Sequence, residues 1–367
     1  MEQYRGALAS QHLQVLLNNG VIRYEQPLFD DQLQPSTLDL RLGDVAYRVR
    51  TSFLPGVGRS VQTCIDRLAM HEINLSDGAV LERGCVYIVP LQESLSLPAF
   101  FSAAANPKSS TGRLDVFTRL ITDQAREFDQ VVSGYEGKLY AEICPQTFSV
   151  LVRSGSRLSQ LRVRAGESFL DDSEHVQLHQ TRQLTNDTIS TEHIRGGIPL
   201  TADVLGENNN GLIGYRAKRH AGVVDIDKIG ACEVTDYWEP IYINEQAKAQ
   251  GLILDPGEFY ILASREAVHV PVDHAAEMVA HDSLVGEFRV HYAGFFDPGF
   301  GAPEAGGEGS RAVLEVRSYE VPFLLEHGQY VGRLMYESLS DIPEKIYGSG
   351  LSSNYQSQGL KLSKHFR

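Results

Sequence analysis

Short apolar runs separated by Gly, Pro, Ser and Asn recur along most of the chain. The runs are rich in β-branched and aromatic residues, a pattern that predicts strands. The clearest predicted strands cover residues 85–91, 138–143, 148–153, 258–262, 312–317 and 330–336. A helical pattern is clearest over residues 10–18 and ends at Asn19-Gly20, as a C-terminal helix cap does. Many short strands with few helices predict a mainly β protein built as a barrel or sandwich.

Two stretches, starting at Leu81 and Leu254, repeat one another at an offset of 173 residues (254 − 81 = 173). The matching positions at this offset are Gly84 and Gly257, Tyr87 and Tyr260, Glu93 and Glu266, Pro98 and Pro271, Glu142 and Glu315, Gly155 and Gly328, and Leu161 and Leu334. Any two β-rich segments share turn and strand residues, but a constant offset over this distance favours a duplication. We therefore expect an N-terminal domain over residues 1–175, a polar connection over 176–205 and a C-terminal domain over 206–367.

The charge balance narrows the classes of partner. The chain has 367 residues, with 33 Lys and Arg against 47 Asp and Glu, so its net charge is −14 (33 − 47). Nucleic acids and anionic membranes need a basic surface, so we expect neither as a partner, although a small phosphate pocket stays possible. The four cysteines are widely spaced, and no apolar segment approaches the roughly 20 residues of a membrane span. These features, with a polar N-terminus that lacks a signal peptide's apolar run, predict a reduced, cytoplasmic protein.

Residues 106–113 (Asn-Pro-Lys-Ser-Ser-Thr-Gly-Arg) are the sharpest local motif. Lys108 and Arg113 flank three hydroxyl groups and a glycine, a combination that suits the oxygens of a di- or triphosphate. The same residues also fit an ordinary polar turn. The segment is neither a Walker A loop nor a Rossmann fingerprint, so a nucleotide would be held in another way.

Two carboxylates lie inside predicted strands, at Glu142 and at its repeat partner Glu315. Apolar neighbours disfavour the charged form, so we expect a raised pKa, which suits a general base that must also return a proton. The alternative is a glutamate that points outward from an alternating strand. Asp297, before Pro-Gly, is a third candidate acid, although this tripeptide most often only forms a turn.

Several segments resemble the dCTP deaminases of the trimeric dUTPase superfamily: 34–43, 89–123, 312–340 and 355–359. The resemblance implies a tandem, mainly β chain of two dUTPase-like β-barrel or β-clip domains with a few short helices. It implies hydrolysis of dCTP to dUTP and ammonia, with no catalytic metal and with Mg²⁺ bound only to the triphosphate. The H-x-E and P-C-x-x-C pattern of zinc deaminases is absent from the sequence. The family also implies a trimer of two-domain chains, a place before dUMP and thymidylate synthesis, and dUTP or dTTP as further ligands.

The resemblance assigns roles to individual residues. The segment 108–113 matches the family's R-S-S-x-x-R phosphate loop, with Lys108 in place of the first arginine. By this resemblance the catalytic residues are Glu142, Glu315, Arg113 and Ser109, and the substrate-binding residues are Lys108, Ser110, Asp129, Asp297, Tyr347 and Gln358.

The repeat is imperfect where phosphate would bind. At the offset of 173, the second copy of the loop is 281–286, in which Gly286 replaces Arg113 and Asp282 replaces a hydroxyl residue. Two arrangements are therefore open, because sites of this superfamily form between neighbouring domains. Like domains could form a ring and join Arg113 to Glu142, or unlike domains could join residues 108–113 to Asp297, Glu315 and the tail. We favour the first, since the first copy holds both parts.

Two other functions compete with dCTP deamination. Residues 155–161 resemble a dUTPase strand motif, so the chain could be a dUTP diphosphatase or a bifunctional enzyme that releases dUMP. The second copy of the loop, in which Arg113 and a hydroxyl residue are replaced, also fits a protein that binds a nucleotide without catalysis. Away from these motifs, we expect Trp238 to serve packing and the charged tail 361–367 to be solvated.

Overall fold

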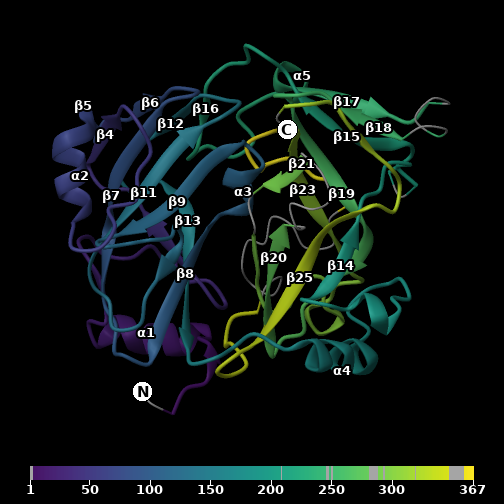
Figure 1. Ribbon diagram of the computed structural model, residues 1–367, viewed down its shortest axis with the longest axis horizontal. Helices are drawn as coiled ribbons and strands as arrows, with labels where there is room; N and C mark the ends of the chain where they lie inside the picture. The colour runs from purple at the N-terminus through teal and green to yellow at the C-terminus, as the bar shows by residue number, and fades with distance from the viewer. Residues whose placement is uncertain are drawn as a thin grey trace.

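The chain folds into two β domains that lie side by side (Figure 1). This computed structural model describes residues 3–207, 209–244, 248, 251–280, 288–291, 294–318, 320–346 and 359–367. The predicted mainly β architecture is confirmed, and the predicted helix at residues 10–18 forms with the predicted bounds. None of the helices in these ranges is long and apolar enough to cross a membrane.

The first domain consists of two larger sheets, a small sheet and short helices. Its elements are β1 (Gly6–Ala7), α1 (Ser10–Asn18), β2 (Ile22–Tyr24), β3 (Leu38–Arg41), β4 (Val45–Val49), α2 (Val61–Leu68), β5 (Ala69–Asn74), β6 (Ala79–Leu81), β7 (Val86–Ser96), β8 (Phe101–Pro107), α3 (Ser109–Gly112), β9 (Val116–Thr122), β10 (Gln130–Val131), β11 (Glu136–Pro145), β12 (Val150–Val152) and β13 (Arg157–Ala165). The strands run in the orders β1-β13-β8-β10, with β3 also on β13, and β5-β4-β7-β11-β9, with β2 also on β7.

The second domain repeats this plan. Its elements are α4 (Asp172–Arg182), η1 (Thr191–His193), β14 (Ile198–Thr201), β15 (Leu212–Ala217), β16 (Val224–Asp225), α5 (Val234–Tyr237), β17 (Trp238–Tyr242), β18 (Leu252–Leu254), β19 (Phe259–Val268), β20 (His274–Ala280), β21 (Phe288–His291), β22 (Phe295–Phe296), η3 (Pro303–Ala305), β23 (Ser310–Ser318), β24 (Phe323–Leu325) and β25 (Tyr330–Ser338). The strand orders are β14-β25-β20-β22 and β17-β15-β19-β23-β21, with a separate β18-β24 pair.

The duplication holds at the level of single strands. Strands β6, β8, β12 and β13, moved by 173 residues, coincide end to end with β18, β20, β24 and β25. The sheet register is conserved as well, because Glu142 lies opposite Ile88 in the first copy and Glu315 lies opposite Ile261 in the second. Since both members of each pair differ by 173, the two glutamates occupy the same place in the two sheets.

Residues 176–205, expected as the connection, contribute to the core of the second domain. Asp171 caps α4 in a capping box with Glu174, which gives the segment a defined helical start. Strand β14 then pairs with β25. The buried side chains of the stretch, which join the core of the second domain, are Leu184, Ile194, Ile198, Leu200, Ala202 and Val204. The domain limits given above remain predictions.

The two copies use equivalent connections in different ways. In the first copy, the chain between β4 and β5 forms α2, whose Val61, Cys64 and Ile65 pack in a small cluster with Ile88 and Tyr140 of its own sheet. In the second copy, the chain between β15 and β17 instead reaches the first domain, where β16 pairs in parallel with β12. One connection therefore covers its own domain, and the other joins the two domains together.

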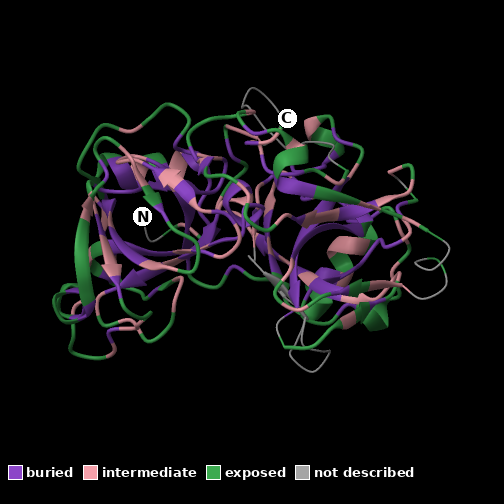
Figure 2. Ribbon diagram, turned by 90° about the horizontal axis from the view of Figure 1, so that it is seen from above, coloured by how far each residue is buried: buried purple, intermediate pink, exposed green. Residues whose placement is uncertain are grey.

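Aromatic side chains continue the first core across the domain boundary. Trp238 is buried and lies edge-on to Phe148, with ring centroids 5.4 Å apart. Phe366, near the C-terminus, packs against both rings. Trp238 therefore serves packing, as predicted. The expectation of a solvated tail is wrong, because Leu362 and His365 are buried. Figure 2 shows buried residues inside both domains and along their contact.

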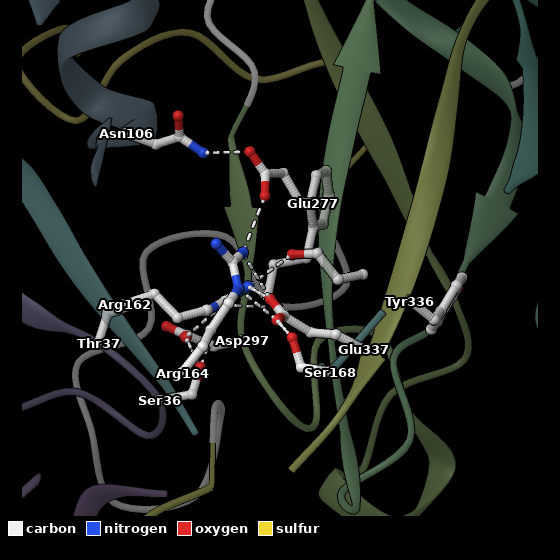
Figure 3. A network of polar contacts seen from close by, with 12 residues as sticks. Ser36, Thr37, Asn106, Arg162, Arg164, Ser168, Glu277, Asp297, Tyr336 and Glu337 are labelled. Carbon is white, nitrogen blue, oxygen red and sulfur yellow. Dashed lines mark hydrogen bonds and ion pairs between the residues drawn. The ribbon is translucent and has the colours of Figure 1, made fainter. Parts of the chain in front are cut away.

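A buried ion network also joins the two domains (Figure 3). Glu337 of β25 accepts hydrogen bonds from Arg162 (2.8 Å) and from Nε of Arg164 (2.7 Å), both on β13. Arg164 also donates to Glu277 at 3.0 Å. Ser168 donates to the second oxygen of Glu337 at 2.8 Å. Because Arg164 and Glu337 are 173 residues apart, the same position of the repeat carries opposite charges in the two copies.

We predict that Glu337→Gln lowers the free energy of unfolding by about 3–5 kcal/mol, because it leaves buried guanidinium groups without their carboxylate. Burial raises the pKa of Glu337, but Arg162 and Arg164 lower it more, so the wild-type group is ionised at neutral pH. Glu136→Gln is the matched control: its pair with Arg23 is exposed, so the expected loss is below about 1 kcal/mol. Urea unfolding of both variants tests this, and equal losses would contradict it.

Candidate functional site

A cavity of about 560 Å³ lies where the two domains meet. The first domain lines it with the loop at 108–113 and with Arg157. The second domain contributes residues 294–297 together with Val313 and Glu315. The cavity therefore brings the phosphate-loop candidate of the first copy together with Asp297 and Glu315 of the second copy.

The phosphate-loop candidate forms one turn of helix at the end of a strand. Strand β8 ends at Pro107, and Lys108 precedes α3 in an extended conformation. The amide of Lys108 donates to the carbonyl of Leu158 at 2.9 Å, which fixes the loop against β13. Ser109 and Ser110 line the cavity with Lys108, as the sequence analysis expected of a phosphate loop. Their binding role stays a prediction.

Arg113 and Glu315 meet across the domain boundary. Nε of Arg113 lies 3.8 Å from Oε1 of Glu315, and both side chains are buried. Burial raises the pKa of Glu315 to about 8, although the positive charge of Arg113 acts in the opposite direction. A carboxyl group with a pKa near neutral can both accept and return a proton, which is the requirement for a general acid-base.

Asp297 lies at the same cavity and is held by residues of the first domain (Figure 3). Its Oδ1 accepts a hydrogen bond from Ser36 at 2.8 Å and lies 3.5 Å from a guanidinium nitrogen of Arg162. Arg162 in turn donates to the hydroxyl of Ser36 at 3.1 Å. Burial raises the pKa of Asp297, whereas Arg162 and Ser36 lower it in part. The carboxyl group is therefore more than a turn former, because it is fixed in direction toward the cavity.

Glu142 and Asp129 do not line this cavity. Oε1 of Glu142 accepts a hydrogen bond from Nε of Arg119 on the neighbouring strand, at 3.1 Å. Asp129 accepts from the backbone amide of Leu120 at 2.7 Å, and burial raises its pKa to about 7. The arrangement that we favoured, a ring of like domains that joins Arg113 to Glu142, stays a prediction. Within a chain, the loop faces the glutamate of the other copy.

The segments that pack on each sheet explain why the loop faces Glu315 and not Glu142 within a chain. Tyr140 and Glu142 project from the same face of β11, since alternate residues of a strand share a face. The α2 segment packs on that face, with Tyr140 in its cluster. The equivalent residue in the second copy is Val313 (140 + 173), which belongs to the core formed mostly by the first domain. The first domain therefore covers a face of the sheet of the second domain, and the equivalent face in the first domain is covered by α2.

Several charged residues at the cavity were not predicted from the sequence. Asp39 forms an ion pair with Lys108, and Arg157 pairs bidentately with Asp31 at 2.8 and 2.9 Å. Asp39 lies inside segment 34–43, which resembled the family, and Arg157 lies inside segment 155–161, which resembled a dUTPase strand motif. Polar residues of those two segments were therefore the missed signal. Lys364 also lines the cavity, and the expectation of a solvated tail hid it.

Tyr347, Gln358 and the second-copy loop at 281–286 lie outside the described residues. Among the residues that the structure describes, no group of three or more His, Cys, Asp or Glu side chains is placed to hold a metal ion.

The chain matches models of one protein family along most of its length. Residues 4–167 match the N-terminal domain, and residues 171–366 the C-terminal domain, of 2'-deoxycytidine 5'-triphosphate deaminase. A crystal structure of 2'-deoxycytidine 5'-triphosphate deaminase from Agrobacterium tumefaciens is 58% identical, with a TM-score of 0.86. The match covers 91% of this chain and 99% of that chain. The predicted tandem, mainly β fold of two domains is thereby confirmed.

Curated relatives match over a shorter stretch. The "dCTP deaminase, dUMP-forming" of Kocuria rhizophila is 36% identical over 118 residues, which is 31% of this chain and 57% of the relative. The protein of the same name from Leifsonia xyli subsp. xyli is 36% identical over 122 residues, 32% of this chain and 57% of the relative. The chain therefore spans little more than half the length of the curated relatives it matches.

We predict that the buried carboxyl of Glu315 makes stability depend on pH. A carboxyl whose folded pKa is raised from 4.5 to about 8 stabilises the fold fully below its unfolded pKa, and this stabilisation is lost as pH rises through 8. The loss is on the order of 4 kcal/mol at about 1.4 kcal/mol per pKa unit. Glu315→Gln does not titrate, so its unfolding free energy should fall less between pH 5 and 9 in urea titrations. Equal pH dependence of both proteins would contradict this.

Proposed function

Because the chain belongs to the 2'-deoxycytidine 5'-triphosphate deaminase family, we propose that it hydrolyses dCTP to dUTP and ammonia in the cavity between its domains. The observation that carries the proposal is the buried Arg113–Glu315 pair, at a cavity that also holds the cations of the phosphate loop. The similarity to the Agrobacterium tumefaciens structure, which spans both copies, supports the same activity.

The proposed orientation of dCTP follows from charge. The triphosphate lies toward Lys108, Ser109, Ser110 and Arg157, since cations and hydroxyl groups bind phosphate oxygens. The sugar lies toward Asp297, whose carboxylate can accept a hydrogen bond from a sugar hydroxyl. The cytosine ring then lies toward Glu315, where water must be activated.

In the proposed mechanism, the ionised form of Glu315 takes a proton from a water molecule as the water oxygen attacks C4 of cytosine. As the C4–O bond forms, the electrons of the C4–N3 double bond move to N3, and C4 becomes a tetrahedral carbon that carries both the hydroxyl and the amino group. Glu315 then returns the proton to the amino nitrogen, the bond from C4 to that nitrogen breaks as the C4–N3 double bond forms again, and ammonia leaves. The hydroxyl proton moves to N3, which gives the uracil ring. Arg113 orients the carboxylate and keeps part of it ionised, because its positive charge acts against the effect of burial on the pKa.

We propose that Mg²⁺ enters with the triphosphate as part of the substrate. Oδ1 of Asp39 is buried without a hydrogen-bond partner, and Asp39 lies at the phosphate end of the cavity. This carboxylate suits a hard cation that accompanies the phosphates. The ion would neutralise phosphate charge there.

Release of dUMP is the second candidate, because the curated relatives carry the name "dCTP deaminase, dUMP-forming". It requires attack of a second water on phosphorus, after which pyrophosphate leaves. Either product would feed the synthesis of thymidylate. We further propose a homotrimer of two-domain chains, a cytoplasmic location in keeping with four cysteines outside disulfides, and dUTP or dTTP as possible further ligands.

We predict that Glu315→Gln lowers kcat for ammonia release from dCTP by about 10²–10⁴-fold, because it removes the general base. Glu142→Gln is the matched control from the equivalent position, and its kcat should stay within about threefold of wild type. Ammonia and nucleotide products should be followed together, so that dUTP and dUMP with pyrophosphate are distinguished. The proposal fails if Glu315→Gln keeps wild-type activity, or if Glu142→Gln alone loses it.

A further inference from the structure

Residues 361–365, near the C-terminus, lie between the phosphate loop and the second domain. Ser363 donates from its hydroxyl to the carbonyl of Ser110 at 2.7 Å, and Arg113 donates to the carbonyl of Lys361 at 2.9 Å. On the other side, His365 contacts the carbonyl of Ile226 at 2.8 Å. The segment 361–365 is therefore fixed to the loop that the proposed triphosphate would contact.

This anchoring places Lys364 at the cavity. Its neighbours Ser363 and His365 are buried and hydrogen-bonded to one another, so the position of Lys364 between them is fixed. The backbone carbonyl of Lys364 accepts from the amide of Gly230 at 3.0 Å. The side chain lines the same cavity as Lys108 and Arg157.

The charges around Lys364 favour an anion. Lys364 lines the cavity together with Lys108 and Arg157, which pair with Asp39 and Asp31. Burial lowers the pKa of Lys364, and the positive charges of Lys108 and Arg157 lower it further, whereas Asp39 and Asp31 raise it in part. The free protein therefore holds this ammonium at an electrostatic cost that a polyphosphate would remove.

We propose that Lys364 is a substrate-binding residue that contacts the distal phosphates and makes the cavity select nucleoside triphosphates over monophosphates. This selectivity rests on the proposed function, but the contact itself requires only a polyphosphate. Lys364 differs from Lys108 in its position in the chain, because it lies near the C-terminus. The chain end thus adds a cation to a loop that lies more than 250 residues earlier (364 − 108 = 256).

The test compares Lys364→Met with Lys364→Arg and with Arg367→Met. Arg367, which forms an exposed pair with Glu233, provides the matched control. Arg367→Met removes one positive charge from the same segment without touching the cavity. Calorimetry should measure the binding of inorganic tripolyphosphate and of dCMP to each variant. Ammonia release from dCTP should be measured in parallel.

We expect Lys364→Met to bind tripolyphosphate about 10- to 100-fold more weakly, as expected for one lost charge-assisted hydrogen bond. Its KM for dCTP should rise by a similar factor, and its affinity for dCMP should change less than about threefold. Lys364→Arg and Arg367→Met should bind tripolyphosphate within about threefold of wild type.

Unchanged tripolyphosphate affinity in Lys364→Met would overturn the proposal, and so would a wild-type chain that binds no tripolyphosphate. A lowered melting temperature together with equal weakening for dCMP would also overturn it, because the role would then be structural. If tripolyphosphate binding depends on Lys364 but dCTP releases no ammonia, only the proposed deamination fails.

Discussion

The buried pairing of Arg164 with Glu337 is the constraint on which the two-domain structure depends. The two residues occupy one position of the repeat, so the duplicated strands β13 and β25 meet with opposite charges. Two identical copies arranged in this way would bring like charges together, which is costly away from water. Divergence at this position therefore specifies that a first domain pairs with a second one. Arg162 belongs to the same network and also lies beside Asp297, so the interface network contacts a residue that lines the cavity.

The pairing of unlike domains places the loop of one copy and the glutamate of the other at one cavity. The loop of the first copy reaches Glu315, whereas Glu142 is covered by α2 and paired with Arg119. Glu315 is costly for the fold at neutral pH, because burial opposes its charge. The interface offsets such a cost through the Glu337 network and the aromatic contacts of Trp238. Stability is thus concentrated where it keeps an unfavourable carboxyl group in position.

The repeat and the phosphate loop at the cavity were predictable from sequence, because both depend on local patterns. Strands and turns recur at a fixed offset, and the 108–113 loop is contiguous, so neither needs knowledge of distant contacts. The partner of Arg113 was not predictable in this way. It depends on which sheet face is left open, and α2 covers the first face through packing that no motif marks. Lys364 was missed for a related reason, since a charged tail becomes buried only through contacts with Ser110 and Ile226.

Mixing two inactive variants tests most directly whether one chain contains the whole site. Arg113→Ala lacks the loop cation, and Glu315→Gln lacks the carboxylate that faces it. The two chains should be refolded together in equal amounts, with each variant refolded alone for comparison, and ammonia release from dCTP measured. If the loop and the glutamate come from the same chain, the mixture releases ammonia no faster than the sum of the separate variants. Recovery well above that sum would show that the two groups come from different chains, and would contradict the site described for this protein.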